Sequence, residues 1–132
     1  MADIIINGTS YPLKFGMKFL REVNKRNAVP VEGMKGVTEN VGMKWMIAEL
    51  MDNSVEALAD AIFTANKTES PRLTLPEIDE FLDSEETDID GVFNDVIGFL
   101  ETANATKRLV QDMKEMVAKK KKAEMELEDE II

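Results

Sequence analysis

The chain has 132 residues, of which 44% are hydrophobic and 32% charged, the balance of a soluble globular protein rather than a disordered one. It contains no cysteine and no histidine, which excludes disulfides and thiolate sites and removes the commonest general base and zinc ligand. Its net charge is −10, and residues 51–100 carry 13 acidic against 2 basic side chains, so this part should repel nucleic acid. With no apolar run near the ~20 residues that span a bilayer and no visible secretory signal, we expect a cytoplasmic protein without membrane partners.

The first predicted element is a β-hairpin over residues 3–15. The β-branched run Ile4 to Ile6 favours a strand over a helix. Asn7 and Gly8 tolerate the positive φ that a two-residue hairpin turn requires. Residues 9–15 then return as the second strand.

An amphipathic helix is predicted after Gly16, with Met17, Leu20 and Val23 on one face and Phe19 beside them. A hairpin that leads directly into such a helix has one apolar side. We therefore expect the rest of the chain to cover it.

The same stretch carries a resemblance to a known family. Ile-Asn-Gly, Tyr-Pro-Leu-Lys-Phe-Gly and Phe-Leu-Arg-Glu, all within residues 4–22, resemble the N-terminus of tail assembly chaperones of long-tailed phages and prophages of Gram-positive bacteria. The resemblance implies a protein of the host cytoplasm that binds the tape measure protein, keeps it soluble while the tail tube forms, and is absent from the mature virion. It also implies the major tail protein as a second candidate partner.

Residues 27–36 contain one proline and two glycines and are predicted to form a loop. Thr38 or Asn40 is a candidate cap for a helix over residues 41–51. One apolar stripe of this helix, widened by neighbouring apolar residues, covers most of its circumference. The stripe comprises Val41, Trp45, Ala48 and Met51, and the residues that widen it are Met43, Met46, Ile47 and Leu50.

Three further helices are marked by their caps. Ser54 precedes a helix over residues 55–66, which should pack against the helix before it. Thr74-Leu-Pro-Glu77 is a capping box with Leu73 and Ile78 at the positions of a hydrophobic staple, and predicts a helix over residues 75–83. Asp88 caps a helix from residue 89 to about 103.

The last predicted helix runs from residue 105 to about 121, after a bend at residues 102–106. Its apolar residues recur at helical spacing: Leu109, Val110, Met113, Met116 and Val117, with Lys120 continuing the line. Four successive lysines and the acids behind them predict fraying and then a charged flexible tail over residues 119–132. The predicted fold is mainly α with a small N-terminal β-hairpin (α+β): a single compact helical domain over residues 1–118, with about five or six helices.

No group of residues predicts catalysis, a metal site or a cofactor. The acids between Glu77 and Asp95 alternate with apolar helix positions, which is typical of a solvated face. Residues 83–91 resemble a calcium loop in composition, but the ligand spacing of an EF-hand is absent.

The remaining feature is a surplus of apolar helix surface, rich in methionine, whose side chain adapts to irregular partners. We predict partner contacts at Trp45, Met46, Met113, Met116 and Val117, through which the chain forms a homo-oligomer or holds a tail protein. Two other classes remain open: a structural tail or connector subunit retained in the virion, and an enzyme that uses paired carboxylates.

Overall fold

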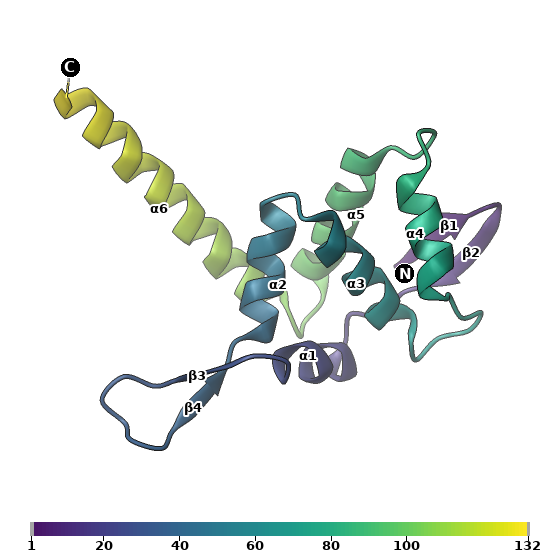
Figure 1. The fold of residues 1–132 in the computed structure, drawn as a ribbon, viewed down its shortest axis with the longest axis horizontal. Coiled ribbons are helices and arrows are strands. Elements are labelled where there is room, and N and C mark those ends of the chain that lie inside the picture. Colours follow the sequence, from purple (N-terminus) through teal and green to yellow (C-terminus); the bar gives the residue numbers. More distant parts are fainter. Residues whose placement is uncertain (1, 132) are drawn as a thin grey trace.

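The computed structural model describes residues 2–131, which form four strands and six helices. The strands are β1 (Asp3–Ile6), β2 (Thr9–Pro12), β3 (Ala28–Pro30) and β4 (Thr38–Asn40). The helices are α1 (Met17–Asn24), α2 (Gly42–Met51), α3 (Val55–Asn66), α4 (Leu75–Asp83), α5 (Ile89–Thr102) and α6 (Lys107–Ile131). In Figure 1, α1 to α5 and the first hairpin form a body, from which β3–β4 and α6 project. The predicted class, mainly α with an N-terminal β-hairpin, is confirmed.

The N-terminal hairpin has the turn that the sequence predicts. β1 and β2 pair antiparallel, with Ile6 opposite Thr9. Between them, Asn7 and Gly8 have φ of 52° and 79°, the left-handed values that two-residue hairpin turns require. The strands therefore keep a fixed register, which places Ile6 in the core.

The second strand of this hairpin ends at Pro12, before the predicted end at Phe15. Proline has no N–H, so the chain leaves the ladder there. The Lys14 N–H instead donates to the carbonyl of Ala65 near the end of α3, at 2.9 Å. This bond joins the hairpin to the helical body.

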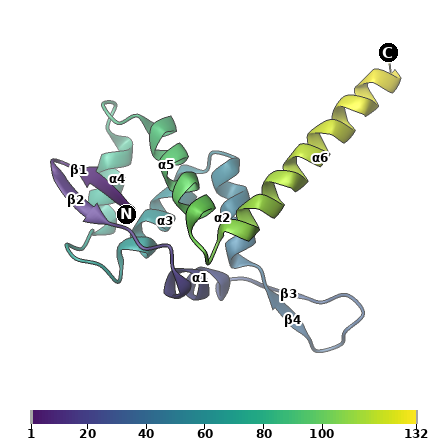
Figure 2. The same cartoon turned by 180° about the vertical axis from the view of Figure 1, so that it is seen from behind.

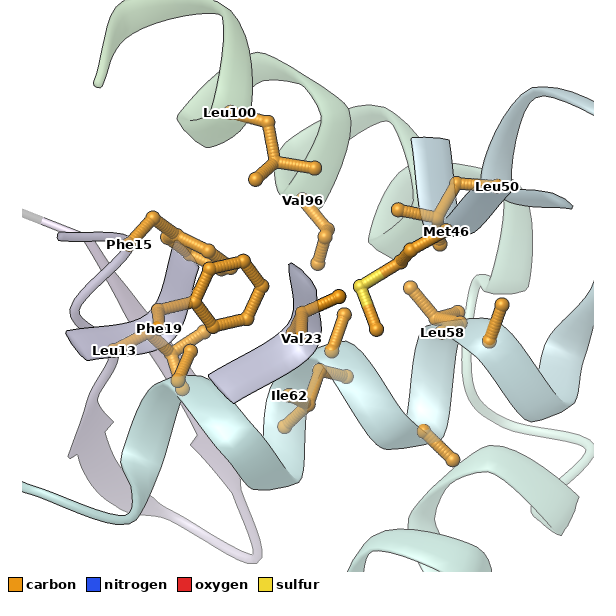
Figure 3. Packing of buried hydrophobic residues seen from close by; sticks show 14 of the residues in the cluster. Leu13, Phe15, Phe19, Val23, Met46, Leu50, Leu58, Ile62, Val96 and Leu100 are labelled. Atoms are coloured by element: carbon orange, nitrogen blue, oxygen red, sulfur yellow. The ribbon is translucent and has the colours of Figure 1, made fainter. Parts of the chain in front are cut away.

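The hydrophobic core lies where α1 meets α2, α3 and α5 (Figure 3). Phe15 and Phe19 pack edge to face with ring centroids 5.0 Å apart, and Phe15 also stacks on Phe99 at 5.9 Å. Val23, on the next turn of α1, is buried, whereas Met17 at the start of that helix is half exposed. The core face of α1 is therefore centred on Phe19 and Val23, and the prediction that Met17 shares this face is wrong.

Helix α2 begins within one residue of its predicted start, but its cap was predicted wrongly. Val41 precedes the helix without any side-chain capping bond, and Asn40 belongs to β4. The N–H of Met43 instead donates to the side-chain oxygen of Asn24 at 3.4 Å. A residue at the end of α1 therefore pairs with a free N–H at the N-terminus of α2. Gly42 lies so close to α1 that a Cβ there would meet the carbonyl oxygen of Val23 at 2.0 Å.

The loop predicted over residues 27–36 is in fact part of a second hairpin. β3 and β4 pair antiparallel, with Val29 opposite Glu39. The Val31 N–H extends the ladder by donating to the carbonyl of Val37 at 3.0 Å. This hairpin, the β3–β4 arm, projects from the body beside α1 and α2 (Figures 1 and 2).

Helices α3, α4 and α5 have the predicted caps. The hydroxyl of Ser54 accepts a hydrogen bond from the N–H of Ala57 at 3.2 Å. Thr74 and Glu77 form the reciprocal capping box at the start of α4. Asp88 accepts from the N–H of Gly91 at 3.1 Å. These three helix starts therefore follow local sequence.

Helix α6 differs from its prediction at the C-terminal end. The bend before it is confirmed, but the helix continues to Ile131 instead of ending near Lys121. The lysine run 119–122 is therefore helical, although repulsion between the four positive charges predicts that the helix frays there. Figures 1 and 2 both show this half of α6 extending away from the body. Of the predicted tail, Ile132 lies outside the described residues.

Candidate functional site

Three of the predicted partner-binding residues lie together where α6 leaves the body. Met113 is half-buried and packs on the core, whereas Met116 is 62% exposed and Val117 38% exposed. Their spacing of three and four residues places them on one face of the helix. We call these three residues the α6 base surface.

The base of α6 is held by contacts on several sides. The hydroxyl of Thr106, which is buried, donates to the carbonyl of Leu100 at 2.7 Å. Val110 is also buried in the core, and Lys114 forms an ion pair with Glu101 of α5. These contacts fix the direction in which α6 projects and so present the base surface in one orientation.

A groove of about 530 Å³ adjoins this surface, between the end of α2, α5 and α6. Its lining combines apolar side chains with two amides and, on one side, an ion pair; the residues are Leu50, Met51, Asn53, Phe93, Asn94, Ile97, Gly98, Glu101, Lys114 and Val117. Gly98 adds to the opening because it has no side chain and nothing lies within 4 Å of where its Cβ would be. The groove can therefore take apolar side chains from another chain.

The two predicted residues on α2 do not belong to this surface. Met46 is only 5% exposed and packs in the core (Figure 3), so its prediction as a surface residue is wrong. Trp45 is 46% exposed but does not line the groove beside α6. α2 is apolar around most of its circumference, and its buried face follows Met43, Met46, Ile47 and Leu50 rather than the predicted stripe through Trp45.

The sequence did not identify the apolar tip of the β3–β4 arm. Met34 and Val37 are both exposed there. Gly33 and Gly36, each with φ of 79°, form the turns of this tip. These two glycines are three residues apart and are followed by the β-branched residues Val37 and Thr38. This pattern is the sequence signal from which the second hairpin could have been predicted.

The surface formed by α4, α5 and the turn between them is strongly acidic. Residues 73–106 contain ten acidic and no basic side chains. A depression of about 480 Å³ lies within it, lined by Glu80, Glu86, Asp88 and Asp95 among other residues. This face repels phosphates and other anions.

Within the same region, hydrogen bonds shift one carboxylate. The hydroxyl of Thr74 donates to Glu77 at 2.8 Å, and the Thr74 N–H donates to the same oxygen at 3.2 Å. Together these bonds lower the pKa of Glu77, the hydroxyl having the larger effect. The shift belongs to the helix cap, because the bonds that cause it are those of the capping box. No group of three or more acids suited to hold a metal ion occurs among residues 2–131.

Residues 2–131 also include no helix with the length and hydrophobicity needed to cross a membrane. The apolar side chains exposed on α6 and on the β3–β4 arm form short patches on otherwise polar elements. Such patches are typical of contacts with other proteins.

Comparison with known proteins gives one match. A family model described as "Phage tail assembly chaperone protein, TAC" matches residues 3–115, which is most of the chain and ends within the base of α6. No curated protein and no solved structure matches the chain.

Proposed function

The chain belongs to the phage tail assembly chaperone family, and we propose that it binds the tape measure protein and keeps it soluble and competent for assembly while the tail tube forms. The family match over residues 3–115 is the observation that carries this proposal. We propose no chemical reaction for the chain, whose role is to bind and release a client. The major tail protein is its second candidate partner.

The α6 base surface and the adjoining groove are the proposed client site. On this proposal, the tape measure protein exposes apolar side chains before the tube surrounds it, and the chaperone covers them until then. Met116 is unbranched and Val117 borders the groove, so the surface offers both an adaptable contact and a concave one. Burial of such apolar contacts stabilises a complex without requiring one fixed client sequence.

Binding to tape measure protein fragments tests this site. Met116→Glu with Val117→Glu places two charges on exposed positions, where they leave the fold intact but oppose apolar contact. We expect the affinity for the client to fall by at least about tenfold, which corresponds to a loss of about 1.4 kcal/mol. Met125→Glu is the matched control, because Met125 lies farther along the same helix and is 66% exposed.

The control should bind the client as the unchanged chain does. Equal affinity of the double variant and the unchanged chain would refute the site. If the unchanged chain does not bind the fragments at all, the proposal that the tape measure protein is the client would be refuted.

We also propose that the chain acts in the host cytoplasm and leaves before the particle is finished. Quantitative mass spectrometry of purified virions tests this, and we expect the chain at far below one copy per tail while the tape measure protein is readily found. A stoichiometric amount would instead identify a structural tail or connector subunit.

A further inference from the structure

The distal half of α6 is not covered by the other residues that the structure describes. Lys114 forms an ion pair with Glu101 of α5, Val117 borders the groove beside α5, and every side chain from residue 114 to residue 129 is exposed. At 1.5 Å per residue, residues 114–131 extend for about 27 Å. Figures 1 and 2 show that this segment points away from the body.

The apolar stripe that packs α6 onto the body continues along this exposed segment. Met113 contacts the core, and Met116, Ala123 and Leu127 follow on the same helix face at intervals of three, seven and four residues. Leu127 is 60% exposed. The same face is therefore covered at the base of the helix and uncovered beyond it.

The charges of this segment form two blocks of opposite sign. Lys119–Lys122 are four cations, and Glu124, Glu126, Glu128 and Asp129 follow as anions. The last turn of α6 has no basic residue, so its acids oppose the negative end of the helix dipole. Lysines four residues before glutamates are also in the weaker orientation for pairing within a helix. A partner that brings cations to the acidic end and anions to the lysines would stabilise the segment.

We propose that this partner is the distal half of α6 from a second copy of the chain, in antiparallel orientation. A two-fold axis near Lys121 and Lys122 would set Met116 level with Leu127 of the other copy. It would also bring Lys119 beside Glu126 of the other copy, because these two residues flank the stripe on the same side. The apolar stripes then face each other. A parallel pair would set lysines against lysines and acids against acids. The helix is too short for the ~1,200 Å² of a stable interface, so the dimer is weak and reversible.

Charge exchange in the full-length chain tests the pairing by sedimentation equilibrium. The unchanged chain should shift from monomer toward dimer between about 10 and about 500 µM, the range expected for so small an interface. Lys119→Glu, and separately Glu126→Lys, should each weaken association at least about tenfold. Both changes in one chain restore opposite charges only if the helices are antiparallel, and should restore association at the wild-type net charge.

Cysteine pairs test the orientation, because the chain has no cysteine of its own. Under mild oxidation, Met116→Cys mixed with Leu127→Cys should give a mixed disulfide, since these stripe positions lie level in the antiparallel pair. Disulfides formed within each variant alone would indicate a parallel pair and overturn the proposal. So would a wild type that stays monomeric throughout, or a charge-exchanged double variant that fails to associate. Unchanged circular dichroism and melting temperature of each variant confirm that the body remains folded.

Discussion

Asn66 is a single residue on which three segments of the fold depend. Its side chain is fully buried at the end of α3. The amide nitrogen donates to the carbonyls of Pro12 and Pro71 at 3.0 Å each, and the amide oxygen accepts from the N–H of Leu73 at 2.6 Å. The residue thus joins the first hairpin, α3 and the segment that leads into α4. Sequence reasoning found only the end of a helix here, because its partners lie up to 54 residues away.

Replacing Asn66 with alanine should lower the free energy of unfolding by roughly 3 kcal/mol, because one buried and two partly buried backbone groups lose their hydrogen-bond partner. Urea denaturation followed by circular dichroism measures the loss. Asn94→Ala, at an exposed helix position, is the control and should stay within about 0.5 kcal/mol of wild type. Equal midpoints for the two variants would mean that the Asn66 bonds do not hold these segments together.

Glu77 gives a prediction for pH. Its pKa is lowered in the folded chain by the Thr74 hydroxyl and then by the Thr74 N–H, so its stabilising effect is present above the pKa of the unfolded state. That effect is lost as the pH falls through the lower, folded pKa.

The difference in melting temperature between wild type and Glu77→Gln should therefore be largest near pH 7 and shrink below about pH 4. Glu80→Gln is the control on the same helix, since no hydrogen-bond donor to the Glu80 side chain occurs among the described residues. A difference that does not change with pH would show that the charge of Glu77 plays no part in the cap.

At the scale of elements, the sequence predicted those helix starts that depend on hydrogen bonds between residues close together in the chain. The Ser54, Thr74 and Asp88 caps are short-range hydrogen bonds and could be identified from spacing alone. The β3–β4 arm could not, because its strands have three residues each and pair residues as far apart as Ala28 and Asn40. The extent of α6 was also missed, because repulsion in the lysine run argued against helix.

The candidate site was predicted in part for a similar reason. Met113, Met116 and Val117 follow a single stripe on a helix that is otherwise charged, so periodicity identified their shared face. On α2, apolar residues surround most of the helix, and only tertiary packing decided that Met46 is buried and Trp45 exposed.

Two glycines in helices should respond to alanine in opposite directions. Gly98→Ala should stabilise the protein by about 1 kcal/mol, because helix propensity improves and nothing occupies the space of the new methyl group. Gly42→Ala should destabilise it by several times that amount, about 3 kcal/mol, because the methyl group would overlap the carbonyl of Val23 and separate α2 from α1. Thermal unfolding of both variants measures this contrast, and stabilisation by Gly42→Ala would contradict the close contact of these helices.

At the scale of the whole molecule, a well-packed body carries two projections (Figures 1 and 2). The body concentrates the acidic charge on α4 and α5, and the exposed apolar side chains of α6 and the β3–β4 arm lie on elements that extend from it. A net charge of −10 opposes self-association of the body, while the projecting apolar groups remain accessible to a partner. Such an arrangement suits a protein that covers another chain temporarily.

Solubility of the tape measure protein during co-expression tests the proposed function most directly. We expect the tape measure protein to stay in the supernatant after centrifugation with the unchanged chain or with Met125→Glu, and to sediment when the chain is absent. With Met116→Glu and Val117→Glu combined, it should sediment as though no chaperone were present. A tape measure protein that remains equally soluble without the chain would contradict the chaperone role, and protection by the double variant at the wild-type level would contradict the α6 base surface as the client site.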